Sequence, residues 1–413
     1  MLDRLLRTQA FDRPRAVRKP KRTFRCQRTR GSTDKPDVIP PSAEPRIIET
    51  LAARLRGERV GISATLVAEA RRHRVHLLLA ETLSPAERRE PAGAALVAEL
   101  RSAAILTALR DGALNRLLDA FAAAPIETLV LKGAALAHTI YPAPHLRPRA
   151  DLDLLIASRH VTDADRLLIA EGWTRALEPD STLASAQRHY QRRCPSGITE
   201  QLDLHWKIAN LRVFGDAVTF EELWTRAERI PTLGGHARTP SRADALFIAC
   251  VHRVAHHDDA ADLLWLWDVH VLVSGFSAAE ADRFVDLAVA RRMRAVCTRG
   301  VALAAECFHT PGAAALVARL DRRPARAEPS ARLVGGDLRL VDLLRADLAA
   351  TAGWRARITL VTEHLFPGQS YMRSVYGRWP AALLPLAYAH RIVRGAPKWF
   401  RTPSSWREPN GLR

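Results

Sequence analysis

Two short segments in the middle of the chain alternate aspartate with leucine, and this alternation constrains the fold more than any other feature. Residues 151–156 read DLDLLI and residues 201–206 read QLDLHW. In a β-strand, successive side chains point to opposite faces. Asp151 and Asp153 therefore share one face, Asp203 and His205 share another, and the leucines between them enter the core. The alternation predicts two half-buried strands that carry carboxylates on their polar faces.

The segments around these strands indicate a mixed fold. An apolar run at 126–131 predicts a strand, helical spacing follows at 133–140, and Val161 to Gly172 predicts a helix. Two further extended segments, 187–194 and 198–206, flank the turn-forming residues Pro195-Ser196-Gly197. The predicted fold class is α/β (α+β), with a small mixed β-sheet core and helical N- and C-terminal modules on either side.

The periodicity divides the chain into five regions. Before the core, and again after residue 242, apolar residues recur at intervals of three and four residues, which predicts amphipathic helices. The regions are a basic tail at 1–45, a helical N-terminal module at 46–125, the core at 126–235, a helical module at 236–320, and a C-terminal helical or irregular segment at 321–413.

Positive charge is concentrated at the start of the chain. The formal net charge is +18, and residues 1–45 hold twelve Lys and Arg against five Asp and Glu, without hydrophobic periodicity. Such a segment cannot bury enough apolar area to offset its ordering entropy. We expect a disordered tail, or one introduced by an upstream start codon. Because the rest of the charge is spread thinly, the composition gives little support to a nucleic-acid partner.

The sequence also bears on location. Its strongly apolar runs are shorter than the roughly 20 residues that a membrane-spanning helix needs, and no apolar segment follows the basic N-terminus as in a secretory signal. We expect no membrane span and a cytoplasmic location. The five cysteines are scattered without metal-site spacing, which predicts reduced thiols.

The aspartates predict a metal site. Two carboxylates in one small volume repel one another unless a cation lies between them, and oxygen ligands favour Mg²⁺ or Mn²⁺. If the two strands are neighbours, Asp203 completes a triad with Asp151 and Asp153. Three carboxylates around two metal ions suit the in-line transfer of a phosphoryl or nucleotidyl group.

Residues upstream of the aspartates are suited to phosphate. Lys132 and Gly133 lie where a strand turns into a helix, so that backbone N–H groups at the start of the helix can meet phosphate oxygens. Arg147 precedes the aspartate pair and carries a guanidinium that can bind a triphosphate. His205, on the face of Asp203, is a further candidate to bind the nucleotide, to orient the acceptor or to pair with Asp203.

The order of these motifs resembles an uncharacterised bacterial nucleotidyltransferase family of the polymerase-β-like superfamily. The resemblance rests on LKG at 131–133, LRPRADLDLLI at 146–156 and DLHW at 203–206, and it extends over roughly residues 100 to 395. It implies Mg²⁺, an NTP donor, catalytic and metal-binding roles for Asp151, Asp153 and Asp203, and a phosphate turn at Gly133. That superfamily usually has Gly-Gly or Gly-Ser at the turn, whereas this chain has Gly133-Ala134.

The expected function is metal-dependent transfer of a nucleoside monophosphate from an NTP to a hydroxyl of an acceptor, which can be a small molecule, a protein or a nucleic-acid end. Because Ala134 lacks the hydroxyl of the usual turn, a second hypothesis remains open. In it the chain is a catalytically silent nucleotide-binding or scaffold protein on the same fold.

Two further groups have competing interpretations. His252 and His256 fall on one helix face at i and i+4, where a structural or substrate-lining role is favoured over a zinc site. Trp265 and Trp267 lie in the apolar run 263–268, where core packing is favoured over stacking on a nucleobase.

Overall fold

The computed structural model describes residues 44–176, 183–194, 197–322, 328–335, 338–377 and 380–400. The basic tail predicted for residues 1–45 lies outside the described residues except for its last two positions, which begin the first helix. The turn predicted at 195–197 also lies largely outside them.

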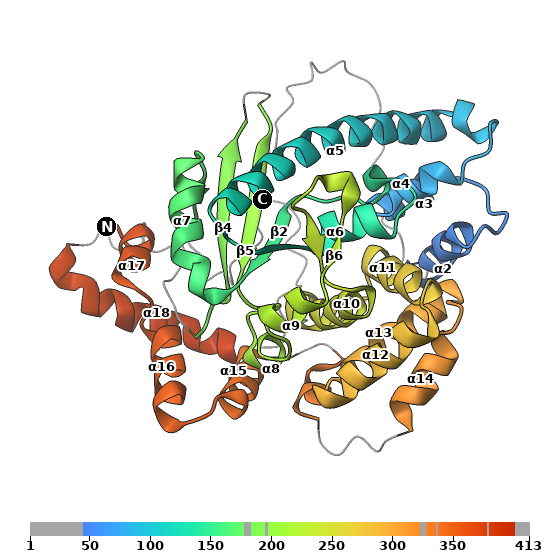
Figure 1. The fold of residues 1–413 in the computed structure, drawn as a ribbon. Coiled ribbons are helices and arrows are strands. Elements are labelled where there is room, and N and C mark those ends of the chain that lie inside the picture. Colours follow the sequence, from blue (N-terminus) through green and yellow to red (C-terminus); the bar gives the residue numbers. More distant parts are fainter. Residues whose placement is uncertain are drawn as a thin grey trace, which may run out of the picture.

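A five-stranded mixed sheet forms the centre of the fold, with helices on both sides (Figure 1). Its spatial order is β1-β2-β5-β4-β3. Only the β2–β5 pair is parallel, and the three other pairs are antiparallel. The strands are β1 (Thr128–Leu131), β2 (Leu152–Ile156), β3 (Thr174–Arg175), β4 (Gln187–Arg193) and β5 (Thr199–His205). The predicted fold class, a small mixed sheet flanked by helices, is confirmed.

The register of β2 and β5 brings the two acidic segments together. Asp153 lies directly opposite Asp203 across this parallel pair. The alternating leucines of both strands point to the other face, where Leu154, Leu202 and Leu204 are fully buried. A core there packs them against helices α5 (Pro91–Ala123) and α7 (Val161–Ala170). Burial of the leucines therefore forces the carboxylates to the opposite face of the sheet.

The chain before the sheet is helical. Its helices are α2 (Glu44–Leu55), α3 (Ala64–Arg72), α4 (His76–Glu81) and α5, and α6 (Lys132–Thr139) follows β1 directly. Ser63 caps α3 by accepting a hydrogen bond from the Leu66 N–H. One described helix, α5, is long and apolar enough to cross a membrane by length and composition alone, a weak indication because core helices of soluble proteins pass the same test.

A second group of helices follows the sheet, and a small hairpin formed by β6 (Glu228–Arg229) and β7 (Arg238–Thr239) separates its second helix from its third. Its members are α8 (Arg212–Gly215), α9 (Phe220–Thr225), α10 (Arg242–His257), α11 (Leu263–Ser274), α12 (Ala278–Ala290), α13 (Arg294–Phe308) and α14 (Ala313–Asp321). Their largest core also includes Leu129, Leu131 and Leu155 of the sheet. This packing places α10 and α11 beside the strands that carry the carboxylates.

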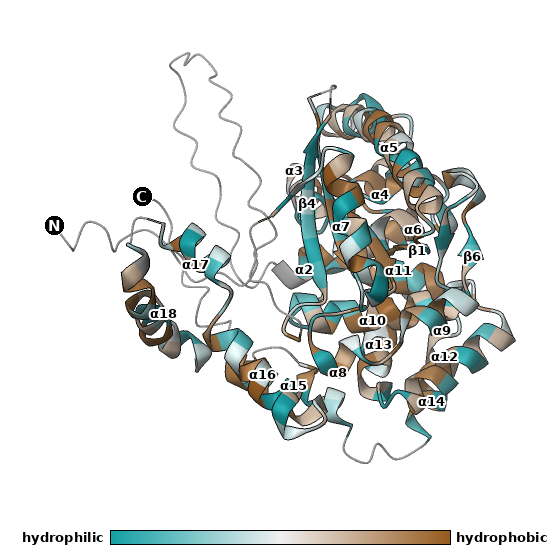
Figure 2. Ribbon diagram, turned by 60° about the vertical axis from the view of Figure 1, so that its left-hand side comes forward, coloured by the Kyte–Doolittle hydropathy of each residue, from teal (hydrophilic) through white to brown (hydrophobic). Residues whose placement is uncertain are grey.

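Four helices complete the described chain: α15 (Leu340–Ala350), α16 (Trp354–Leu365), α17 (Gln369–Val375) and α18 (Leu384–Trp399). They extend to one side of the body (Figure 1). Apolar stretches on α16 and α18 are visible in Figure 2, and Trp354, Leu386 and Val393 are exposed.

Candidate active site

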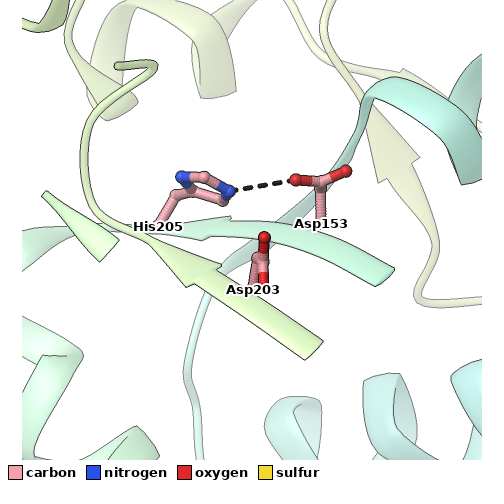
Figure 3. Close-up of side chains that lie close together, drawn as sticks. All are labelled: Asp153, Asp203 and His205. Atoms are coloured by element: carbon pink, nitrogen blue, oxygen red, sulfur yellow. Dashed lines mark hydrogen bonds and ion pairs between the residues drawn. The ribbon is translucent and has the colours of Figure 1, made fainter. Parts of the chain in front are cut away.

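Asp153, Asp203 and His205 form a compact group on the polar face of β2 and β5 (Figure 3). One potential ligand atom from each of the three lies within 4.8 Å of the others. Two carboxylate oxygens and an imidazole nitrogen suit a divalent cation such as Mn²⁺ or Mg²⁺. We call Asp153, Asp203 and His205 the acidic cluster.

His205 is paired with Asp153 rather than with Asp203. Its Nε2 lies 3.0 Å from Oδ1 of Asp153, and the side chain is 1% exposed. Across the antiparallel β4–β5 pair, Nε2 of His189 lies 3.5 Å from Oδ1 of Asp203. Each carboxylate of the cluster therefore has an imidazole as its neighbour, and sequence reasoning did not identify His189.

Lys132 reaches the acidic cluster from the junction of β1 and α6. Its Nζ donates a hydrogen bond to Oδ1 of Asp153 at 2.8 Å and lies 3.4 Å from Nε2 of His205. The backbone φ of Lys132 is 48°, a left-handed conformation uncommon outside glycine that persists where the surrounding structure imposes it. Lys132 is therefore the residue of this junction with the unusual backbone conformation, and its ammonium group contacts Asp153.

Burial and mutual repulsion separate the pKa values of the cluster. Burial, followed by the charge of Asp153, raises the pKa of Asp203 to about 7. Burial also acts to raise the pKa of Asp153, but the Lys132 ammonium and the hydrogen bond from His205 hold it well below its usual value. Burial and Lys132 lower the pKa of His205 to about 4. At neutral pH, Asp153 is ionised, His205 is neutral, and Asp203 is balanced between its two forms.

Asp151 immediately precedes β2. It does not belong to the group of potential ligand atoms that lie within 4.8 Å of one another. Burial and the neighbouring charge of Asp153 raise the pKa of its carboxyl. The structure therefore brings Asp153, Asp203 and His205 together most closely and leaves Asp151 at the edge of the site.

Gly133 allows two arginines to approach the turn between β1 and α6. A Cβ at this position would lie 2.7 Å from Nη1 of Arg147 and 3.4 Å from Cβ of Arg149. The first distance is shorter than real contacts allow, so the absence of a side chain is required for close approach. Two nitrogens of the Arg149 side chain, Nε and Nη1, are buried and have no hydrogen-bond partner among the described residues.

Arg147 is fixed by a buried ion pair that sequence reasoning missed. Its Nε and Nη2 donate to the two carboxylate oxygens of Asp268 at 2.8 and 2.6 Å, and the Tyr141 hydroxyl donates to Oδ1 at 2.6 Å. Asp268 lies on α11, whose other residues in 263–273 are almost all apolar. A lone acid in such a helix is the sequence signal that could have identified it.

A cavity of about 810 Å³ joins these residues. The sheet lines one part of it. Arg71 of α3, Arg74 of the following turn and His76 of α4 line another part, and residues of α10 and α11, among them His252, line the rest. The volume is typical of a pocket for a small ligand. Of the predicted site residues, Lys132, Gly133, Arg147, Asp151, Asp153 and Asp203 line it, whereas His205 does not.

The tryptophans of α11 are engaged with other side chains. The His257 ring stacks on Trp265 with centroids 3.7 Å apart, and the Arg74 guanidinium lies 4.6 Å from the Trp265 centroid. Trp267 meets Phe308 edge-on in the N-terminal core. Packing, the favoured interpretation of both residues, agrees with these contacts.

A mixed sheet with paired aspartates on adjacent strands, a glycine turn and flanking helices is consistent with a nucleotidyltransferase core. The chain belongs to the uncharacterised nucleotidyltransferase family, whose family model matches residues 63–309. The resemblance to an uncharacterised nucleotidyltransferase family is therefore confirmed, over residues 63–309 rather than over roughly 100 to 395. No curated protein matches the chain.

Proposed function

We propose that the protein transfers a nucleoside monophosphate from an NTP to a hydroxyl of an acceptor, in a reaction that depends on Mg²⁺ or Mn²⁺. The observation that carries this proposal is the direct opposition of Asp153 and Asp203 across β2 and β5, with His205 beside them. Family membership supports nucleotidyl transfer in general.

The donor set fits a divalent cation. Burial and the charge of Asp153 raise the pKa of Asp203 to about 7, so a second negative charge there is costly unless a cation offsets it. Asp153 and Asp203 would hold the metal, with Asp151 at the edge of the site. Bound there, Mg²⁺ or Mn²⁺ would lower the pKa of the acceptor hydroxyl and neutralise charge on the departing pyrophosphate.

The residues around the turn suit the triphosphate. Backbone N–H groups at the start of α6 can donate to phosphate oxygens, and Gly133 leaves room for the close approach. Arg147, held by Asp268, directs its remaining Nη1 toward this turn. Lys132 supplies a positive charge between the turn and Asp153. Together these groups offset the charge that develops on the phosphates.

The reaction forms one bond and breaks one. The acceptor oxygen bonds to the α-phosphorus, and the bond from that phosphorus to the oxygen bridging the β-phosphate breaks, which releases pyrophosphate. Asp203 accepts the proton of the acceptor hydroxyl, because an ionised carboxylate beside the metal can act as a general base. His205 supports Asp153 through its hydrogen bond.

The acceptor can be found by labelling. The purified protein is incubated with each α-labelled NTP, Mg²⁺ or Mn²⁺ and a cell extract, and the labelled product is separated by size and by nuclease or protease treatment. We expect one class of molecule to carry the label together with release of pyrophosphate. NTP binding without any pyrophosphate release would instead support the catalytically silent hypothesis.

Metal binding should stabilise the folded protein. At a free metal concentration 100 times the dissociation constant, the stabilisation is about 2.7 kcal/mol, a rise of several degrees in melting temperature. The Asp151→Asn/Asp153→Asn double variant should lose this response, while the Asp163→Asn variant on the outer face of α7 should retain it. An unchanged response in the double variant would show that the metal binds elsewhere.

The metal affinity should depend on pH through Asp203. The ion binds the ionised carboxylate and competes with its proton. Since the pKa of Asp203 is raised to about 7, the affinity should increase with rising pH by up to about tenfold per unit below pH 7 and level off above it. Titration with Mn²⁺, followed by electron paramagnetic resonance on both sides of pH 7, measures this slope. The Asp203→Asn variant should bind more weakly and show a much flatter profile.

A further inference from the structure

Three histidines at the end of α10 form a wall of the active-site cavity that the proposed chemistry does not use. The histidine wall consists of His252, His256 and His257, and all three line the cavity. The rings of His252 and His256 lie 4.9 Å apart between centroids, and Nε2 of His257 lies 3.0 Å from Nε2 of His252. Their mutual contacts make them one unit.

Side chains from α11 and from the turn after α3 pack against the wall. Trp265 stacks on His257, and the Arg74 guanidinium lies against Trp265 while its Nη2 donates to Asp262 at 3.0 Å. Asp262 in turn caps α11 by accepting a hydrogen bond from the Leu264 N–H. The Trp265 ring is thus engaged by His257, by Arg74 and, edge-on at 6.4 Å, by His252.

Two ring nitrogens of the wall have unmet hydrogen-bonding capacity. Nδ1 of His252 and Nε2 of His256 are buried and have no hydrogen-bond partner among the described residues. A buried polar atom without a partner is costly, so such atoms usually have a protein, water or ligand partner. The position of both residues on the cavity indicates that the partner is a bound molecule.

The charges around the wall select an anion. Burial and then the Lys132 ammonium lower the pKa of both His252 and His256. For His257 the causes are burial, then Arg74 and Lys132, and together they lower its pKa to about 3. The wall thus consists of neutral imidazoles, each of which can present one N–H donor, in a positive field that is opposed by the ionised Asp153. A ligand with several anionic oxygens accepts hydrogen bonds from these imidazoles and offsets the positive charge around them.

Two other ligands fit less well. Nε2 of His252 and Nε2 of His257 lie 3.0 Å apart, but a metal site would need at least a third ligand atom close to both. The close group of three potential ligands found in the described part of the chain is the acidic cluster and not the wall. A nucleobase would need a free aromatic face, whereas Trp265 packs against His257 and Arg74.

We propose that His252 and His256 bind the β- and γ-phosphates of the NTP and hold the pyrophosphate as it leaves. This assignment rests on the proposed nucleotidyl transfer and specifies where its leaving group is bound. The wall and the phosphate turn at Gly133 both line this one cavity. The part of the cavity lined by Gln187, His189 and Gln191 of β4 is left for the acceptor.

The test measures binding of inorganic pyrophosphate by calorimetry, without any transfer reaction. The His252→Leu and His256→Leu variants each replace one ring with an apolar side chain that can make no hydrogen bond. Each should weaken pyrophosphate binding by roughly tenfold, as expected for the loss of one hydrogen bond to a charged group. The matched control is His236→Leu in an exposed loop before β7, which should bind as the wild type does.

Each outcome either supports or overturns the assignment of His252 and His256 to pyrophosphate binding. Weaker pyrophosphate binding, with Mn²⁺ binding and melting temperature close to wild type, supports the assignment even if no acceptor is ever labelled. Unchanged pyrophosphate binding in both variants, or a wild type that binds no pyrophosphate, overturns it even if transfer is observed. Tight Zn²⁺ binding by the wild type that both variants lose also overturns it, in favour of a metal site. If one variant does not fold, the other decides.

Discussion

Replacing Asp203 with asparagine is expected to reduce kcat for nucleotidyl transfer by at least about 100-fold, the effect of removing a group that acts mainly in the transition state. The change keeps the shape of the side chain and removes both its negative charge and its ability to accept the acceptor proton. Because the proposed triphosphate contacts come from the turn at Gly133, Arg147 and Lys132, the affinity for NTP should fall much less. Steady-state rates of pyrophosphate release over a range of NTP concentrations separate the two effects.

The control for this variant lies on the same strand. Glu200 points to the opposite face of β5, where Nη2 of Arg192 lies 2.9 Å from its Oε2. Glu200→Gln should therefore leave the transfer rate near wild type, although it weakens an ion pair. Near wild-type transfer by Asp203→Asn would mean that another residue accepts the proton. Equal losses in both variants would point to damage to the strand rather than to the site.

Replacing Asp268 with alanine is expected to destabilise the protein by about 3–5 kcal/mol, the cost of leaving a buried charge without its partner. Arg147 is 7% exposed and Asp268 is 2% exposed. The change removes two hydrogen bonds from the guanidinium and one from the Tyr141 hydroxyl. Denaturant unfolding of the variant and the wild type measures the difference.

Two companion variants give the cause of this loss. Asp282→Ala removes one partner of an ion pair with Arg319 in which Asp282 is 66% exposed, and exposed pairs contribute about 1 kcal/mol or less. The Arg147→Met/Asp268→Leu double variant replaces the buried pair with apolar side chains and should recover much of the lost stability. It should not recover transfer, because the guanidinium beside Gly133 is gone. Full activity in the double variant would show that Arg147 has only a structural role.

The position of the wall and of Asp268 explains why sequence reasoning found only part of the site. The helical spacing of His252 and His256 is a local sequence pattern. No local pattern shows that their helix packs beside the sheet. Arg147 and Asp268 are 121 residues apart in the chain. Their pairing follows from the way α11 packs beside the glycine turn.

The sequence alone determined the strands and the face on which their aspartates lie. Alternation is a property of neighbouring residues in an extended chain, so residues 151–156 and 201–206 carry that information by themselves. The mixed α/β class followed from the same local patterns, and the structure confirms it. The roles assigned to Asp151, Asp153 and Asp203 remain predictions.

Only the tertiary structure decided which groups meet. His205 and Asp153 are 52 residues apart, and their contact exists because β2 and β5 pair in parallel with Asp153 opposite Asp203. Lys132 joins them through a left-handed backbone conformation that no residue pattern indicated. Strand order, register and helix packing depend on burying apolar surface from the whole chain at once. For this reason the chemistry of each side chain could be read from the sequence, whereas its partners and its pKa could not.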